Sequence, residues 1–243
     1  MNRLAKAFEK KKALIVFVAA GDPNIEATQK LVVAAAQAGA DIVQIGVPFS
    51  DPVASSPEVQ QADQRALAKG CTLDQIFDMA AQIREKVEIP LILKTYMNPI
   101  FVYGKTRFMG KCKLSGIDGV IVPDLPFEER EELVTVCTLH GVARIPVIAQ
   151  AAMDRIGMVA KDAEGFIIMP MLDAALTKLV KAFSPLPCVV GLDAPTAEQA
   201  REAVAIADGL SIESAIVRLV ALYGANSVGH VKEYIEKMRK ILI

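Results

Sequence analysis

Asp41-Ile-Val-Gln-Ile-Gly-Val-Pro-Phe-Ser-Asp-Pro-Val-Ala-Ser-Ser-Pro57 joins a short apolar run to a loop rich in proline and serine. A strand that is buried on both faces of a parallel sheet has such a continuous apolar run. Runs of this kind alternate with longer amphipathic segments along the whole chain. Eight strands are therefore expected, at residues 14–19, 41–46, 91–96, 119–122, 144–148, 165–169, 188–191 and 209–212.

The segments between these runs have helical periodicity. The clearest patterns cover residues 25–38, 73–87, 105–115, 128–140, 174–183, 197–206 and 214–222, and residues 227–243 predict a docked terminal helix. Right-handed β-α units repeated in this number close into a (βα)₈ barrel, the TIM barrel, which fills about 250 residues. Residues 1–243 are therefore expected to form a single α/β TIM-barrel domain. An open doubly wound sheet is the alternative, but Ala19-Ala-Gly-Asp-Pro23 lacks its glycine-rich turn.

The composition limits the classes of ligand and partner. The chain has 243 residues, of which 53% are apolar and 23% charged, and its net charge is −1. Such a balance gives no electrostatic reason to expect nucleic acid or an acidic membrane as partner. Four scattered cysteines and two histidines suggest neither a disulfide framework nor a metal site, and no cofactor is expected. The absence of a long apolar stretch and of a signal-peptide core predicts a cytoplasmic protein.

The stretch 41–57 resembles the second strand and following loop of the tryptophan synthase alpha subunit family. Three further segments resemble the same family in order, namely Phe17–Pro23, Thr95–Phe101 and Asp118–Pro126. The resemblance covers about the first 130 residues and thins beyond Gln150. It implies a barrel enzyme that cleaves indole-3-glycerol phosphate to indole and glyceraldehyde 3-phosphate and passes indole to a pyridoxal-phosphate β subunit.

Two positions depart from the family's catalytic pattern. Where the family has a glutamate on strand two and an aspartate in the following loop, this chain has Gln44 and Ser55. A general acid or base contributes about 10² to 10⁴ in rate, and an amide or a hydroxyl does not titrate near neutral pH. The family reaction is therefore expected to be severely impaired, unless Asp51 or Asp124 has taken over the role.

The end of the site where the family binds phosphate is also altered. Asp193 replaces a glycine after strand seven, and Glu213 replaces the glycine before Ser214. Two like charges about 4 Å apart repel by roughly 4 kcal/mol at an effective dielectric near 20, so loss of phosphate binding is expected. The loop after strand six is cut to Pro170-Met-Leu-Asp173, with Asp173 as the expected N-cap of the next helix, which leaves little room for a lid.

Lys94 adds a titratable amine to the inside of the barrel. The alternation of a strand places Lys94 on the same inward face as Tyr96. A desolvated lysine is the usual Schiff-base nucleophile toward carbonyls, and it can also hold a ligand carboxylate. The alternative is an internal ion pair with Glu213 or Asp193, which would explain two substitutions as mutual compensation.

These observations favour a divergent paralogue, a pseudoenzyme for the parent reaction, that acts on a non-phosphorylated small molecule as a lyase or aldolase-like protein. Its predicted catalytic residues are Lys94, Gln44 and Ser55, and its predicted ligand-binding residues are Phe17, Tyr96, Asp124, Ile168, Asp193, Glu213 and Ser214. A second hypothesis is a non-catalytic regulatory or scaffolding partner of a β-subunit-like protein, with an interface at Pro48, Phe49, Asp51 and Asn98. The third is an authentic tryptophan synthase alpha chain.

Overall fold

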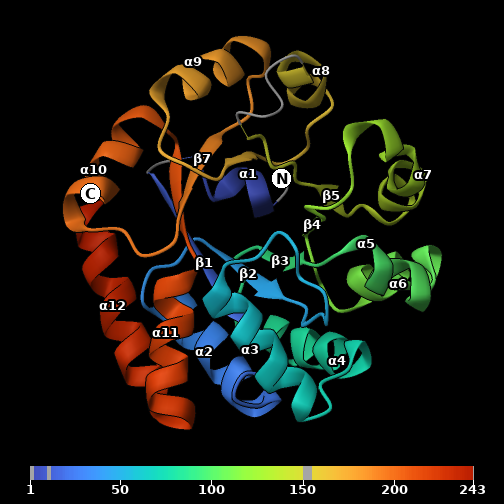
Figure 1. Cartoon of the computed structure of the whole chain (residues 1–243), viewed down its shortest axis with the longest axis vertical. Coiled ribbons are helices and arrows are strands. Elements are labelled where there is room, and N and C mark those ends of the chain that lie inside the picture. Colours follow the sequence, from blue (N-terminus) through green and yellow to red (C-terminus); the bar gives the residue numbers. More distant parts are fainter. Residues whose placement is uncertain (1–2, 10–11, 150–154, 243) are drawn as a thin grey trace.

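The computed structural model describes residues 3–9, 12–149 and 155–242, and its centre is an eight-stranded parallel sheet curled into a barrel (Figure 1). The strand order is β5-β4-β3-β2-β1-β8-β7-β6. The strands are β1 (Ala13–Ala19), β2 (Ile42–Gly46), β3 (Leu91–Lys94), β4 (Gly119–Ile121), β5 (Ala143–Arg144), β6 (Ile167–Met169), β7 (Cys188–Leu192) and β8 (Gly209–Ile212). The α/β barrel expected from the sequence is thus confirmed.

The barrel closes between β5 and β6 through a short seam. Val147 and Ile168 form an isolated parallel bridge there. The amide of Ile148 donates to the carbonyl of Ile168 at 2.8 Å, and the amide of Ile168 donates to the carbonyl of Pro146 at 3.0 Å. The strand expected at 144–148 is reduced to two residues because Pro146 has no amide proton to extend the ladder.

Helices pack around the sheet, and four of the described helices did not stand out in the sequence pattern. These are α1 (Arg3–Lys6), α3 (Pro57–Ala68), α5 (Met97–Tyr103) and α8 (Ile156–Lys161). The others are α2 (Ile25–Gln37), α4 (Leu73–Arg84), α6 (Lys105–Leu114), α7 (Glu131–His140), α9 (Ala174–Phe183), α10 (Ala197–Ile206), α11 (Ser214–Tyr223) and α12 (Ser227–Ile241), with 3₁₀ turns η1 (Phe127–Glu129) and η3 (Gly224–Asn226). Within the described ranges, no helix has the length and apolarity that crossing a membrane requires.

Side chains alternate between the two faces of each strand, so the sheet separates an apolar region outside the barrel from one inside it. Outward side chains such as Val16 and Val43 pack in one large cluster with the surrounding helices. Inward side chains such as Ile15 and Ile42 form a second cluster, which Leu4 of α1 completes. Figure 1 shows α1 within the ring of strands. One end of the barrel is therefore filled by apolar side chains, and polar inward residues are left for the carboxyl ends of the strands.

Candidate active site at the carboxyl ends of the strands

Gln44 is fully buried on β2 and directs its amide into the barrel. Its Nε2 donates to Ser211 Oγ on β8 at 3.2 Å, across the intervening strand β1. Its Oε1 is buried without a hydrogen-bond partner. A buried polar atom left unpaired costs about 1–3 kcal/mol, so this acceptor is available for a donor on a bound molecule.

Lys94 and Glu213 form an ion pair across the mouth of the barrel. Lys94 Nζ lies 2.8 and 2.7 Å from the two carboxylate oxygens of Glu213. Both side chains are largely sheltered, with exposed fractions of 15% and 23%. The ammonium also lies 5.4 Å from the centre of the Phe17 ring. Of the two alternatives for Lys94, the structure contains the ion pair with Glu213, which puts an acid and a base within one hydrogen bond of each other.

The Phe17 ring forms the floor beneath this ion pair. It presses against Gly46 of β2 so closely that a Cβ at that position would stand 2.3 Å from the ring. Any side chain larger than hydrogen at position 46 would displace the ring. The glycine therefore allows an aromatic surface to face the polar groups of the mouth.

Ser55 is held by Tyr96. Ser55 Oγ and Tyr96 Oη lie 2.8 Å apart, and the amide of Ala54 donates to the same phenol oxygen at 3.1 Å. Gln60 Nε2 donates to the Ser55 carbonyl at 2.9 Å. Phe49 packs against Tyr96 with ring centres 5.3 Å apart. The loop after β2 is thus fixed over the mouth by Tyr96, which directly precedes α5, and by Gln60 of α3.

A chain of hydroxyl groups marks the start of α11. Ser214 is fully buried, and its Oγ donates to Asp193 Oδ1 at 2.7 Å. Ser56 Oγ lies 3.0 Å from Ser214 Oγ. The Asp193 carbonyl accepts the amide proton of Ala215 at 2.9 Å, and the Asp193 side chain is exposed. The loops after β2, β7 and β8 therefore meet at the first turn of α11.

Other predicted site residues have different surroundings. The Asp124 carboxylate accepts the Met97 amide proton at 3.0 and 3.1 Å, so it caps the start of α5. Ile168 belongs to the apolar cluster inside the barrel. Among the predicted interface residues, Asp51 and Asn98 are exposed, Phe49 is half-buried and Pro48 is buried. The expected N-cap Asp173 is confirmed, since its Oδ1 accepts the Leu176 amide proton at 2.9 Å.

Asp63 is a titratable residue near the mouth that the sequence did not single out. It lies on the buried face of α3 with Val59, Ala62 and Ala66, and it is 3% exposed. Burial raises the pKa of Asp63 to about 7, against the lowering effects of a hydrogen bond from the Phe49 backbone and of the Lys94 charge. An acid inside the apolar stripe of a helix is the pattern that could have revealed it.

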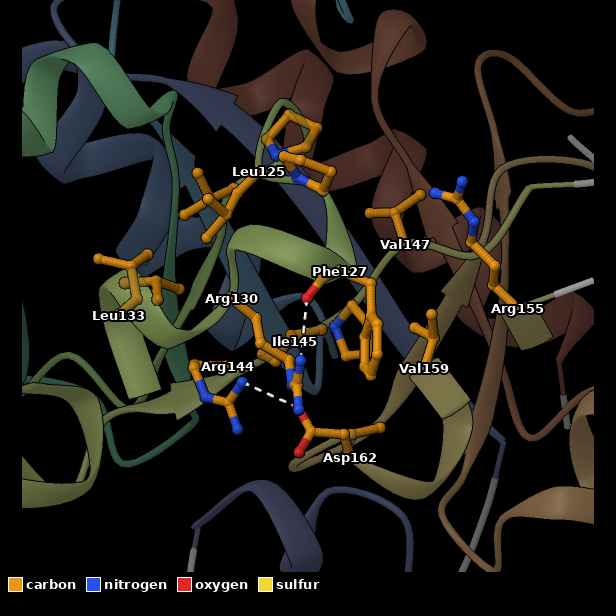
Figure 2. Close-up of a pocket in the computed structure, with 16 residues that line it drawn as sticks. Leu125, Phe127, Arg130, Leu133, Arg144, Ile145, Val147, Arg155, Val159 and Asp162 are labelled. Carbon is orange, nitrogen blue, oxygen red and sulfur yellow. Dashed lines mark hydrogen bonds and ion pairs between the residues drawn. The ribbon is translucent and has the colours of Figure 1, made fainter. Parts of the chain in front are cut away.

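A cavity lies outside the barrel, between β4, β5, η1 and α8 (Figure 2). Its volume is about 280 Å³, and its walls are mostly apolar. Arg130 stacks on Phe127 at 4.1 Å, and Asp162 lies 3.2 Å from both Arg130 and Arg144. Because these guanidinium groups already have a carboxylate partner, the cavity offers an anion little net attraction.

Comparison with known proteins shows full-length relatives. The chain is 36% identical to the tryptophan synthase alpha chain of Caldanaerobacter subterraneus subsp. tengcongensis, with 100% of both chains covered. It is 38% identical to the tryptophan synthase alpha chain of Lactiplantibacillus plantarum, with 100% of this chain and 97% of the relative covered. The resemblance therefore extends well beyond the first half of the sequence.

Solved structures agree with these relatives. Tryptophan synthase subunit alpha from Legionella pneumophila str. Paris superposes with a TM-score of 0.93 at 32% identity, covering 100% of this chain and 98% of that one. A chain of tryptophan synthase from M. tuberculosis superposes with a TM-score of 0.92 at 25% identity, covering 100% and 99%. The overall architecture of the chain thus matches that of these solved structures.

These relatives overturn the prediction of a divergent paralogue or pseudoenzyme with a new, non-phosphorylated ligand. Proteins named tryptophan synthase alpha chain align with the whole sequence at 36% and 38% identity, which favours an active enzyme over an impaired one. The prediction treated the missing carboxylates at positions 44 and 55 as decisive, and the full-length similarity outweighs these two positions. The compensating ion pair that the sequence offered as an alternative is present, since Lys94 contacts both oxygens of Glu213.

The family model of the tryptophan synthase alpha chain matches residues 4–242. This range includes every strand of the barrel and all the polar groups at its mouth. The chain belongs to the tryptophan synthase alpha chain family.

Proposed function

We propose that this protein cleaves indole-3-glycerol phosphate to indole and glyceraldehyde 3-phosphate. The observation that carries the proposal is the full-length similarity to proteins named tryptophan synthase alpha chain. The mouth of the barrel supports it, because titratable, hydrogen-bonding and aromatic groups meet there at the carboxyl ends of the strands. This is the end at which TIM-barrel enzymes build their active sites.

The aromatic part of the substrate fits the inner side of the mouth. The Phe17 ring and the buried ring of Tyr96 supply apolar contact. The unpartnered Oε1 of Gln44 is suited to accept a hydrogen bond from the indole N–H. In this role Gln44 binds and orients the ring, while Ser55 keeps the loop after β2 attached to Tyr96.

The phosphate fits the first turn of α11. Helix N-termini after the last strands of TIM barrels bind phosphate through backbone N–H groups and the helix dipole. Ser214 and Ser56 add hydroxyl donors at this turn. Glu213 is offset by Lys94, and the exposed Asp193 side chain can turn toward solvent when the phosphate enters.

A β subunit is the proposed protein partner. The loop after β2 and helix α5 both lie at the carboxyl ends of the strands and carry exposed apolar side chains. Val53, Phe101 and Val102 have exposed fractions of 73%, 67% and 78%. Together with the exposed Asp51 and Asn98, they form a rim of the kind that protein partners cover.

Indole release from indole-3-glycerol phosphate tests the proposed reaction. The purified chain is assayed alone and with the tryptophan synthase β chain of a relative, and glyceraldehyde 3-phosphate is measured in parallel. Equal amounts of the two products are expected, and the rate should rise in the presence of the β chain. Calorimetric binding of the substrate without product formation would overturn the proposal. Val102→Asp should weaken the response to the β chain without affecting the isolated protein.

A further inference from the structure

Cleavage of indole-3-glycerol phosphate requires one net proton transfer. The hydroxyl on the carbon attached to the ring loses its proton as that carbon becomes an aldehyde, and ring carbon C3 gains a proton as indole is released. An enzyme therefore needs a base near the hydroxyl and an acid near C3. Gln44 and Ser55 cannot fill these roles, because neither side chain titrates near neutral pH.

Most other carboxylates around the mouth are committed to structure. Arg65 holds both oxygens of Asp22, at 2.9 and 2.7 Å. Asp124 caps α5 through the Met97 amide. Asp63 lies on the buried face of α3 and accepts a hydrogen bond from the Phe49 backbone. Asp193 accepts the hydroxyl proton of Ser214 at 2.7 Å.

Lys94 and Glu213 differ from these carboxylates because they pair a proton donor with an acceptor beside the Phe17 ring, and their geometry suits proton transfer. Both lie at the mouth, above the Phe17 ring that would contact the indole. Each retains partial access to solvent and hence to a bound molecule. Their contact of 2.7 to 2.8 Å permits direct exchange of a proton. Lys94 ends β3 and Glu213 directly follows β8, so they approach a molecule in the mouth from two sides.

We propose that Lys94 and Glu213 act together as the general acid and general base of the cleavage. The inference rests on the proposed function. The Lys94 ammonium donates a proton to ring carbon C3, which places a positive charge on the ring nitrogen. The Glu213 carboxylate removes the hydroxyl proton, and the O–H electron pair forms the carbonyl. The bond between C3 and the side-chain carbon breaks, and its electron pair returns to the ring and neutralises the nitrogen.

A final proton transfer between the two side chains regenerates the ion pair. After cleavage Glu213 carries the hydroxyl proton and Lys94 is a neutral amine. Transfer of that proton from Glu213 to Lys94, across the distance seen in the free protein, regenerates the carboxylate and the ammonium. No oxidant, reductant or further proton donor is needed. One proton has moved from oxygen to carbon, which is the balance of the overall reaction.

Steady-state indole formation by the full-length protein tests this assignment. Glu213→Gln and Lys94→Met should each lower kcat by about 10² to 10⁴. The double variant should be little worse than either single one, because the two groups act as a unit. Lys105→Met with Glu132→Gln is the matched control, since this ion pair joins α6 to α7 outside the mouth. Its kcat should be unchanged.

Lys94→Arg tests whether the residue at position 94 must release a proton or need only carry a positive charge. A guanidinium can keep the pairing with Glu213 but does not release its proton near neutral pH. We expect a kcat reduced as in Lys94→Met, with a KM within about threefold of wild type and an unchanged circular dichroism spectrum. Wild-type activity in Lys94→Arg or in Glu213→Gln would overturn the acid–base assignment and leave the proposed reaction standing. If the wild-type protein bound the substrate but released no indole, both the acid–base assignment and the proposed reaction would be wrong.

Discussion

Arg65 on α3 holds both carboxylate oxygens of Asp22, at 2.9 and 2.7 Å, and Asp22 is 2% exposed. This bidentate pair ties α3 to the loop after β1. Arg65→Met should lower the free energy of unfolding by about 3–5 kcal/mol, because it leaves a buried carboxylate without its partner. Urea denaturation measures the change.

Adding Asp22→Asn to Arg65→Met should recover most of that loss, since the buried charge is then gone. Arg218→Met is the matched control, because Arg218 and its partner Glu58 form a more exposed pair whose loss should cost much less stability. Similar losses in the two arginine variants would contradict the role given to Asp22.

The raised pKa of Asp63 predicts a pH-dependent contribution to stability. With a pKa of about 7 in the folded protein against an ordinary value of 3.8, the folded state binds the proton more tightly than the unfolded state. Stability from this group is therefore complete below about pH 4, falls as the pH rises toward 7, and is constant above it. The full difference corresponds to roughly 4 kcal/mol.

Asp63→Asn should remove this pH dependence of stability, so the variant should be more stable than wild type at pH 8 and similar to it at pH 4.5. Denaturation at several pH values gives the difference between the two proteins. Asp78→Asn, at an exposed position on α4, should follow the wild-type curve. A constant difference between Asp63→Asn and wild type across the range would show that Asp63 does not titrate in this window.

Tyr96→Phe should loosen the loop after β2. It removes the phenol oxygen that contacts both Ser55 and the Ala54 amide. Since the loop is partly open to water, the loss of stability should be about 1 kcal/mol, whereas KM for indole formation should rise several-fold as the loop leaves its position. Tyr223→Phe, whose ring stacks on His230, should alter neither quantity. An unchanged KM in Tyr96→Phe would mean that the loop does not need this anchor.

Asp193→Asn should strengthen phosphate binding. The exposed carboxylate lies 2.7 Å from Ser214 at the first turn of α11, where the substrate phosphate is proposed to bind. Replacing it with an amide removes a like charge, so the dissociation constant for indole-3-glycerol phosphate should fall by up to about tenfold. Calorimetric titration measures it, with the exposed Glu202→Gln as control. Weaker binding in Asp193→Asn would place the phosphate elsewhere.

The sequence was sufficient to predict the barrel, because each strand is a continuous apolar run and the helices between them are amphipathic. The short helices α5 and α8 escaped notice, since seven and six residues are too few for a clear period. Lys94 could be placed inside the barrel by strand alternation alone. The choice of Glu213 over Asp193 as its partner required the folded chain, because the pair joins residues 119 positions apart.

The functional prediction failed for a related reason. The residue types at Gln44 and Ser55 indicated a lost reaction, but the sequence did not show which other side chains surround them at the mouth of the folded barrel. Asp63 was not predicted because α3 was not among the expected helices, so the apolar stripe of Val59, Ala62 and Ala66 around it was not recognised. Asp124 was expected to bind the ligand, but its carboxylate accepts the amide proton of Met97 at the start of α5.

Because of the seam at Pro146 and Ile168, the hydrogen bonding between neighbouring strands is not uniform around the barrel. Seven of its junctions are ladders, while the eighth depends on a single bridge and the amides of Ile148 and Ile168. Thermal breathing should begin at this junction, and those two amides should exchange with deuterium sooner than their counterparts in β1 and β2. The mouth groups on β2, β3 and β8 lie on the opposite, continuously bonded part of the wall, so the fold can yield at one side without disturbing the geometry on the other.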